Sequence, residues 1–171
     1  MPDGKGAVGL GKEQAMEEAV CCPEFDPVPW DDTIIEWKDK RFIKGRVCTL
    51  LYIPMNFGGL MRKLMRKIDE SGAASPDHLA LSDHISPWKM DVYVAVDREI
   101  PGGENTAISG RFFSKVYQGP FKNAGAWSND FKAAAARRNL TLGNWYMWYT
   151  TCPKCAKSYG KNYVVLLGKV E

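Results

Sequence analysis

The chain has 171 residues, 45% of them hydrophobic and 25% charged, and its 23 basic and 20 acidic side chains leave a net charge of +3. This length and balance predict a soluble globular protein with one ordinary core, and the even charge argues against a nucleic-acid partner. No apolar run approaches the roughly 20 residues of a membrane span, so no membrane partner is expected. Five cysteines, an odd number, and the lack of a signal-peptide core predict reduced thiols in the cytoplasm.

The first thirty residues are predicted to form a tail and a strap outside the main domain. Residues 1–11 contain four glycines and few large apolar residues, which indicates a flexible tail, and residues 12–20 fit a short helix. Three prolines then punctuate an extended segment, residues 23–30, that carries Phe25 and Trp30. We expect this strap to lie across the domain.

Residues 31–171 are predicted to form one domain, whose first half places a helix between strands. In chain order its predicted elements are strands at 32–37 and 41–54, a helix from 57 to 68, and strands at 79–85 and 88–97. Lys38-Asp39-Lys40 suggests a hairpin turn between the first two strands. Apolar residues recur at helical spacing after Asn56, a suitable N-cap, which supports the helix.

The second half repeats this order of elements. Its predicted elements are a strand at 108–118, a helix opened by Gly119-Pro120, and strands at 145–151 and 162–170. Because both halves follow the order strand, helix, strand, strand, we interpret the chain as an internal duplication. The predicted fold class is α+β: duplicated β-α-β-β units form one antiparallel sheet, with two helices on one face and a ligand groove on the other.

The most informative stretch is residues 144–151, where four of eight side chains are aromatic. In a strand, Trp145, Met147 and Tyr149 share one face, and Tyr146 and Trp148 share the other. Neither face is plainly polar. Either both faces are packed in the core, or one face lines a pocket that uses flat, amphipathic side chains.

A second set of candidate ligand-binding residues comes from the other strands. If the most aliphatic face of each strand packs against the helices, the opposite faces remain open to a ligand. These candidates, to which we add Trp88 at the start of the predicted strand 88–97, are Tyr52, Trp88, Asp91, Tyr93, Phe113, Lys115, Tyr117 and Tyr163. An apolar wall with hydroxyls and a charge is typical of small-molecule sites, although a one-residue slip in register would exchange the faces.

Asp91 is the candidate catalytic carboxylate, because it interrupts an otherwise apolar strand beside Tyr93. A carboxylate among aromatic rings is expected to have a raised pKa, which suits a general base. The alternative is a solvated aspartate at a sheet edge.

Cys152-Pro153-Lys154-Cys155 is a CxxC motif that is predicted to lie in a loop between two strands. A zinc site would need a second pair of ligands, and Cys48, His78 and His84 show no ligand spacing. A redox dithiol would sit between a strand and a helix. The sequence therefore favours ordinary thiols, with no metal and no cofactor.

Ser82-Asp83-His84 has the residue types of a catalytic triad. Adjacent residues on a strand point to opposite faces, so these three cannot form a triad by themselves. We therefore expect His84 to be structural or to serve as a capping hydrogen-bond partner.

Tyr117-Gln118-Gly119-Pro120-Phe121 resembles the strand-to-helix junction of the gyrase-inhibitor-like (GyrI-like), SOUL-related small-molecule-binding domains. The resemblance covers residues 41–170, and residues 145–155 resemble a free-standing branch of that family. It implies binding of planar hydrophobic xenobiotics in an aromatic groove lined by Trp145, Met147 and Tyr149. Met147 stands where members that bind lipophilic cations carry a buried glutamate, which favours a neutral aromatic ligand.

One GyrI-like subfamily, the cyclopropanoid cyclopropyl hydrolases, opens cyclopropane-bearing DNA alkylators inside an aromatic cage. Membership would imply that aromatic rings stack on the ligand, that Tyr149 polarises its carbonyl, and that Asp91 orients the attacking water. Two alternatives remain open: a non-catalytic module that binds or sequesters a ligand, and an interaction domain that binds a peptide on a flat surface.

Overall fold

Seven strands and three α-helices make up the part of the chain that the computed structural model describes, residues 21–171. The predicted tail over residues 1–11 and the short helix over 12–20 lie outside the described residues. In chain order the elements are β1 Thr33–Leu50, β2 Ile53–Pro54, α1 Phe57–Glu70, β3 Ala80–Ser86, β4 Lys89–Ala95, β5 Glu104–Gln118, α2 Ala124–Arg137, β6 Leu142–Tyr149, α3 Pro153–Tyr159 and β7 Tyr163–Val170. No helix in this part is long and apolar enough to cross a membrane.

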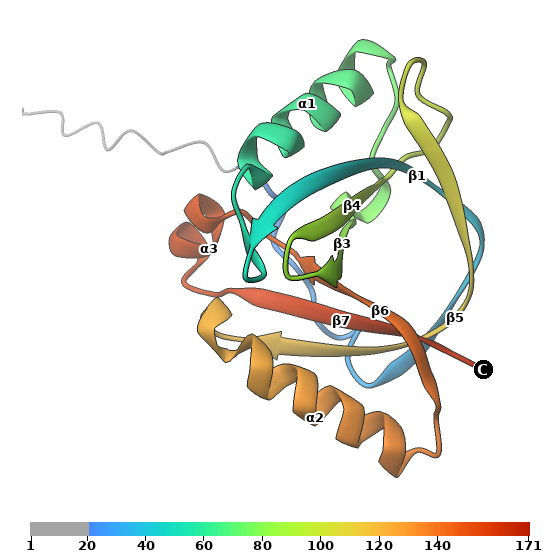
Figure 1. The fold of residues 1–171 in the computed structure, drawn as a ribbon, viewed down its shortest axis with the longest axis vertical. Coiled ribbons are helices and arrows are strands. Elements are labelled where there is room, and N and C mark those ends of the chain that lie inside the picture. The colour runs from blue at the N-terminus through green and yellow to red at the C-terminus, as the bar shows by residue number, and fades with distance from the viewer. Residues whose placement is uncertain (1–20) are drawn as a thin grey trace, which may run out of the picture.

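The sheet curls until its two sides meet. Its strand order is β2-β1-β4-β3-β6-β7-β5, and β1 also pairs with β5, which closes a ring of six antiparallel strands (Figure 1). The predicted α+β class and antiparallel sheet are confirmed. The open groove that we expected on the second face is instead the interior of a barrel, because closure turns that face inward.

Strand β1 is a single long strand where the sequence predicted two. A bulge between Trp37 and Lys40 replaces the expected hairpin turn, and Asp39 adopts a left-handed conformation with φ of 48°. The Asp39 N–H donates a 2.8 Å hydrogen bond to the hydroxyl of Ser109 on β5. A run of polar residues with one left-handed residue can form either a bulge or a turn. Here it forms a bulge, which bends β1 so that the strand pairs with both β5 and β4.

Both helices pack on the outer face of the sheet, as predicted. Leu64 on α1 and Phe131 on α2 are each buried beneath their helices. Ser82 stands opposite Val92 of the α1 cluster and opposite Met147 of the α2 cluster, which shows that the two clusters share one face. Figure 1 shows α1 and α2 on opposite sides of the ring.

The inner face of the barrel is filled by large side chains. This inner core consists mainly of Trp37, Phe42, Leu81, Phe112, Trp148, Val165 and Leu167. The strap packs against it, with ring centroids 5.3 Å apart for Phe25 and Trp148 and 4.8 Å apart for Trp30 and Trp148. The barrel interior is therefore a packed core where these side chains lie. A ligand site is expected only where the barrel wall is interrupted.

Candidate active site

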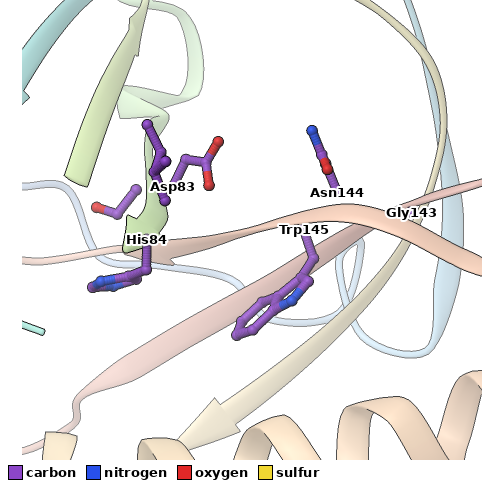
Figure 2. A pocket seen from close by; sticks show the side chains of 7 residues that line it. Asp83, His84, Gly143, Asn144 and Trp145 are labelled. Atoms are coloured by element: carbon purple, nitrogen blue, oxygen red, sulfur yellow. The ribbon is translucent and has the colours of Figure 1, made fainter. Parts of the chain in front are cut away.

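The barrel wall is interrupted between β3 and β6. These strands pair only at Leu81 with Trp148 and at Ser82 with Met147. Beyond Ser82 they separate around a cavity of about 420 Å³, lined by Ser82, Asp83, His84, Ile85, Gly143, Asn144 and Trp145. Figure 2 shows Asp83 and Asn144 on one side of the β6 ribbon and His84 and Trp145 on the other. The cavity is thus lined by residues from both faces of the sheet.

Asp91 lies directly opposite Asp83 on the neighbouring strand β4 and is held by two cations of β1. Its side chain is 3% exposed, and its carboxylate lies 2.7 Å from Arg46 Nε and 3.0 Å from Lys44 Nζ. Burial alone would raise the pKa of Asp91, but the hydrogen bonds from Arg46 and Lys44 hold that pKa below its ordinary value. The expected raised pKa is therefore wrong, and so is the solvated alternative.

Asp83 has the opposite electrostatic environment. Burial and the negative charge of Asp91 raise the pKa of Asp83, with Lys44 opposing the shift. The two facing carboxyl groups therefore have pKa values displaced in opposite directions. Such a separation leaves one carboxylate ionised and gives the other a pKa closer to neutrality, which is the usual basis of acid–base assignments in active sites.

Two tyrosines lie beside this carboxylate pair on the inner face. The rings of Tyr93 and Tyr146 are 5.9 Å apart, and Lys44 Nζ lies 5.7 Å from the Tyr93 ring centroid. Burial, with smaller effects from Asp83 and Tyr93, raises the pKa of Tyr146 to about 12. Burial likewise raises the pKa of Tyr93. Both hydroxyls therefore stay protonated at neutral pH and are available as hydrogen-bond donors.

Ser82 and His84 share the other face of β3. Ser82 Oγ and His84 Nδ1 are buried and have no hydrogen-bond partner among residues 21–171. Burial lowers the pKa of His84, which keeps its imidazole neutral. As predicted from strand alternation, Asp83 is on the opposite face, so the three residues form no triad. Both residues line the cavity, and these two atoms are unsatisfied polar groups buried in its wall.

Residues 12–170 match the protein family described as Bacterial hydrolase. The chain belongs to this family. Comparison with curated proteins gave no match. The family match indicates a hydrolase-like protein, which agrees with the acid–base character of the cavity. The resemblance to GyrI-like domains stays a prediction.

In this member of the bacterial hydrolase family, the aromatic strand faces the other way from our prediction. Met147 is buried beneath α2, and the Tyr149 hydroxyl donates to Met147 Sδ at 3.4 Å. Burial raises the pKa of Tyr149. Tyr146 and Trp148 occupy the inner face instead. Because both faces of this strand are packed with large apolar side chains, composition alone could not choose between them. Of the three residues expected in the groove, Trp145 is the one that lines the cavity.

The open-face assignment of β5 is also wrong. Phe113 is stacked on Phe131 of α2, with ring centroids 5.3 Å apart. Tyr117 is stacked on Trp127, and its hydroxyl donates a 2.8 Å hydrogen bond to Asp130 of the same helix. Lys115 also lies on this outer face, with its Nζ 5.7 Å from the Tyr117 ring centroid. Aromatic residues occur on both faces of β5, so the most aliphatic face was not the one beneath the helix.

The remaining candidates are spread around the barrel. Tyr93 lies beside the carboxylate pair, and Tyr52 packs its ring 6.4 Å from that of His84, close to the cavity. Trp88 is 55% exposed and lies in the turn between β3 and β4. Tyr163 packs against Phe25 of the strap, with ring centroids 5.6 Å apart. Their ligand-binding roles stay predictions, and the structure brings only Tyr52, Tyr93 and Trp145 near the cavity or the carboxylates.

Sequence reasoning missed Asp83, Lys44 and Arg46 as site residues. Asp83 was excluded because the Ser82-Asp83-His84 triad was rejected. Lys44 and Arg46 were missed because their contact with Asp91 depends on how β1 pairs with β4. In that pairing Arg46 stands opposite Asp91, and Lys44 stands opposite Tyr93. The alternation of Lys44 and Arg46 on one face of β1 was a visible signal, but it had no meaning until the partner strand was known.

Proposed function

We propose that this protein is a hydrolase whose substrate binds in the cavity between β3 and β6, with Asp83 as the general base. One observation carries the proposal: two carboxyl groups face each other across β3 and β4, and of these two only Asp91 forms ion pairs with Arg46 and Lys44. Asp91 then acts as a fixed negative charge that keeps the pKa of Asp83 raised. Asp83, which lines the cavity, is the group free to exchange protons.

Hydrolysis in this cavity would follow a simple sequence of proton and bond changes. Asp83 accepts a proton from a water molecule as the water oxygen bonds to an electrophilic carbon of the substrate. The bond to the leaving group breaks, and its electron pair moves to an oxygen that is conjugated with it. The Tyr146 hydroxyl, protonated at neutral pH because its pKa is raised to about 12, can donate a hydrogen bond to that oxygen.

For the substrate class we propose small, planar, hydrophobic molecules that carry a conjugated carbonyl, including reactive cyclopropanes. Trp145 supplies a flat ring at the cavity, and a volume of about 420 Å³ lies within the usual range for small-molecule sites. Ser82 and His84 line the same cavity and add polar side chains to its wall. The GyrI-like resemblance is the reason for including cyclopropanes.

A spiro-cyclopropane fused to a cyclohexadienone is a suitable probe. Water adds to a cyclopropane CH₂, the strained carbon–carbon bond breaks, and the dienone becomes a phenol whose absorbance can be followed directly. We expect catalytic turnover by the wild-type protein and a loss of roughly 100-fold or more in kcat/KM for Asp83→Asn. Asp69→Asn, the same change at an exposed position on α1, is the matched control.

Two outcomes would contradict the proposal. Stoichiometric binding of the probe without turnover would favour the non-catalytic binding module. Turnover that survives Asp83→Asn would place the chemistry elsewhere in the molecule.

A further inference from the structure

The CxxC motif begins a helix, which corrects its predicted place in a loop. Cys152 is the N-cap of α3, and Pro153 occupies the first helical turn. Cys155 follows one turn later and is buried. Residues three apart on a helix lie on the same side, so both thiols point towards one point in space.

A second pair of cysteines completes a cluster around that point. Cys21 and Cys22 directly precede the strap, and Cys21 Sγ lies 3.6 Å from Cys152 Sγ and 3.6 Å from Cys155 Sγ. Cys21 Sγ is also 3.8 Å from Cys22 Sγ, and all four sulfur atoms lie within 4.8 Å of one another. These two cysteines are the second ligand pair that was not found among Cys48, His78 and His84.

The spacing of the sulfur atoms fits a single tetrahedral metal ion. Zinc–sulfur bonds of about 2.3 Å place the sulfur atoms of a tetrahedral site about 3.8 Å apart. A disulfide would require about 2.05 Å, and the separations of 3.6 to 3.8 Å are far longer. Four sulfur ligands in tetrahedral geometry select zinc or iron–sulfur chemistry, and one compact group of four leaves room for one ion.

We propose that Cys21, Cys22, Cys152 and Cys155 bind one zinc ion that fastens the strap to α3. Four protein ligands leave no open coordination position, so the role of the site is structural and not catalytic. Four thiolates around Zn²⁺ carry a net charge of −2, and the nearby sequence supplies the basic residues Lys154, Lys157 and Lys161. Cys48 is exposed and lies outside the cluster, which accounts for the odd cysteine.

Other contacts at this junction hold the strap in the same position. The Tyr159 hydroxyl of α3 donates a hydrogen bond of 2.6 Å to the carbonyl oxygen of Cys22. From Cys22 the chain continues to Phe25 and Trp30, which pack on Trp148 of the inner core. The zinc ion would therefore fix the start of a segment whose aromatic side chains cover part of the barrel core.

The test uses the full chain without an affinity tag, purified under reducing conditions. Mass spectrometry of the metal content should give one zinc per chain for the wild type and for the control Cys48→Ser. The Cys21→Ser variant changes an exposed residue and should lose the zinc while keeping the fold. The Cys152→Ser variant should also lose the zinc and keep the fold. Replacement of zinc by cobalt should give the absorption bands of tetrahedral cobalt bound to thiolates.

Three results would overturn the inference. The first is that reduced wild-type protein contains no zinc. The second is that both Cys21→Ser and Cys152→Ser retain zinc. The third is that protein from a reducing cytoplasm contains a disulfide between Cys21 and Cys152. A chelator should lower the melting temperature of the wild type and of Cys48→Ser but not that of Cys21→Ser.

Discussion

Asp83 and Asp91 stand directly opposite each other on adjacent antiparallel strands, yet of these two carboxylates only Asp91 forms ion pairs with Arg46 and Lys44. Like charges placed across a strand pair normally destabilise a sheet. The two cations of β1 offset this cost by neutralising one carboxylate. The relationship makes the pH dependence of both groups predictable.

The first prediction concerns the stability that Asp91 provides. Its pKa is lower in the folded state, so its contribution is fully present above the unfolded-state value of about 3.9 and is lost as the pH falls through the folded value. Asp91→Asn should cost about 2 kcal/mol at pH 7, below the usual cost of breaking a buried pair because Arg46 and Lys44 reach solvent. Urea unfolding at pH 7 and at acidic pH should show the two proteins converging on acidification. A difference that is independent of pH would contradict the assignment.

The second prediction concerns the pH dependence of catalysis. If Asp83 is the general base, kcat/KM should fall on acidification through a pKa above the ordinary value for aspartate. Asp91→Asn removes the negative charge that raises this pKa, so the acidic limb should move to lower pH. Lys44→Met removes an opposing positive charge, so the limb should move to higher pH. If the acidic limb moved in the same direction in Asp91→Asn and Lys44→Met, or moved in neither, Asp83 would be excluded as the titrating group.

The third prediction separates the two faces of the aromatic strand. Trp148 is 2% exposed and packs in the inner core, so Trp148→Ala should destabilise the protein by about 3–5 kcal/mol. Trp145 is only partly buried and lines the cavity, so Trp145→Ala should cost less stability and should raise KM for the planar probe. Thermal melts and steady-state kinetics on both variants test this. If Trp145→Ala destabilised the protein as much as Trp148→Ala does and left KM unchanged, Trp145 would not be part of the site.

The fourth prediction concerns two buried serines whose hydroxyls have no partner among residues 21–171, Ser82 at the cavity and Ser114 on β5. Removing an unpaired buried hydroxyl leaves no partner unsatisfied, so Ser82→Ala and Ser114→Ala should both leave stability unchanged or slightly increased. Only Ser82→Ala should raise KM, because only Ser82 faces the cavity. The paired measurement distinguishes a substrate contact from a purely structural role. A KM that does not respond to Ser82→Ala would count against that contact.

The order of the elements was predictable because it depends on local patterns. Apolar residues at helical spacing place α1 directly after Asn56, although the Asn56 side chain makes no capping hydrogen bond. The predicted repeat of strand, helix, strand and strand correctly placed α1 and α2 on one face of the sheet, but it missed α3 between β6 and β7. The turn predicted at Lys38–Lys40 was wrong because a bulge and a turn use the same polar residues.

The site was less predictable because it depends on partners that are distant in sequence. Arg46 meets Asp91 only through the register of β1 and β4, and Cys21 meets Cys152 across 131 residues. The face of the aromatic strand was undetermined for another reason: Met147 and Trp148 are both buried, on opposite faces. The alternation of side chains along a strand shows which face is buried only where the other face is polar.

The uneven joining of the two halves has a consequence for how substrate preference could change. β1 and β5 are paired from Thr33 to Lys44, whereas β3 and β6 meet at only two residue pairs. The halves are thus firmly connected on one side of the ring and barely connected on the other, where the cavity lies. Small changes in side-chain volume at Leu81 or Trp148 would alter the spacing of the loosely joined strands without breaking the extensive pairing opposite them. The dimensions of the cavity can therefore vary among related sequences while the rest of the barrel is preserved.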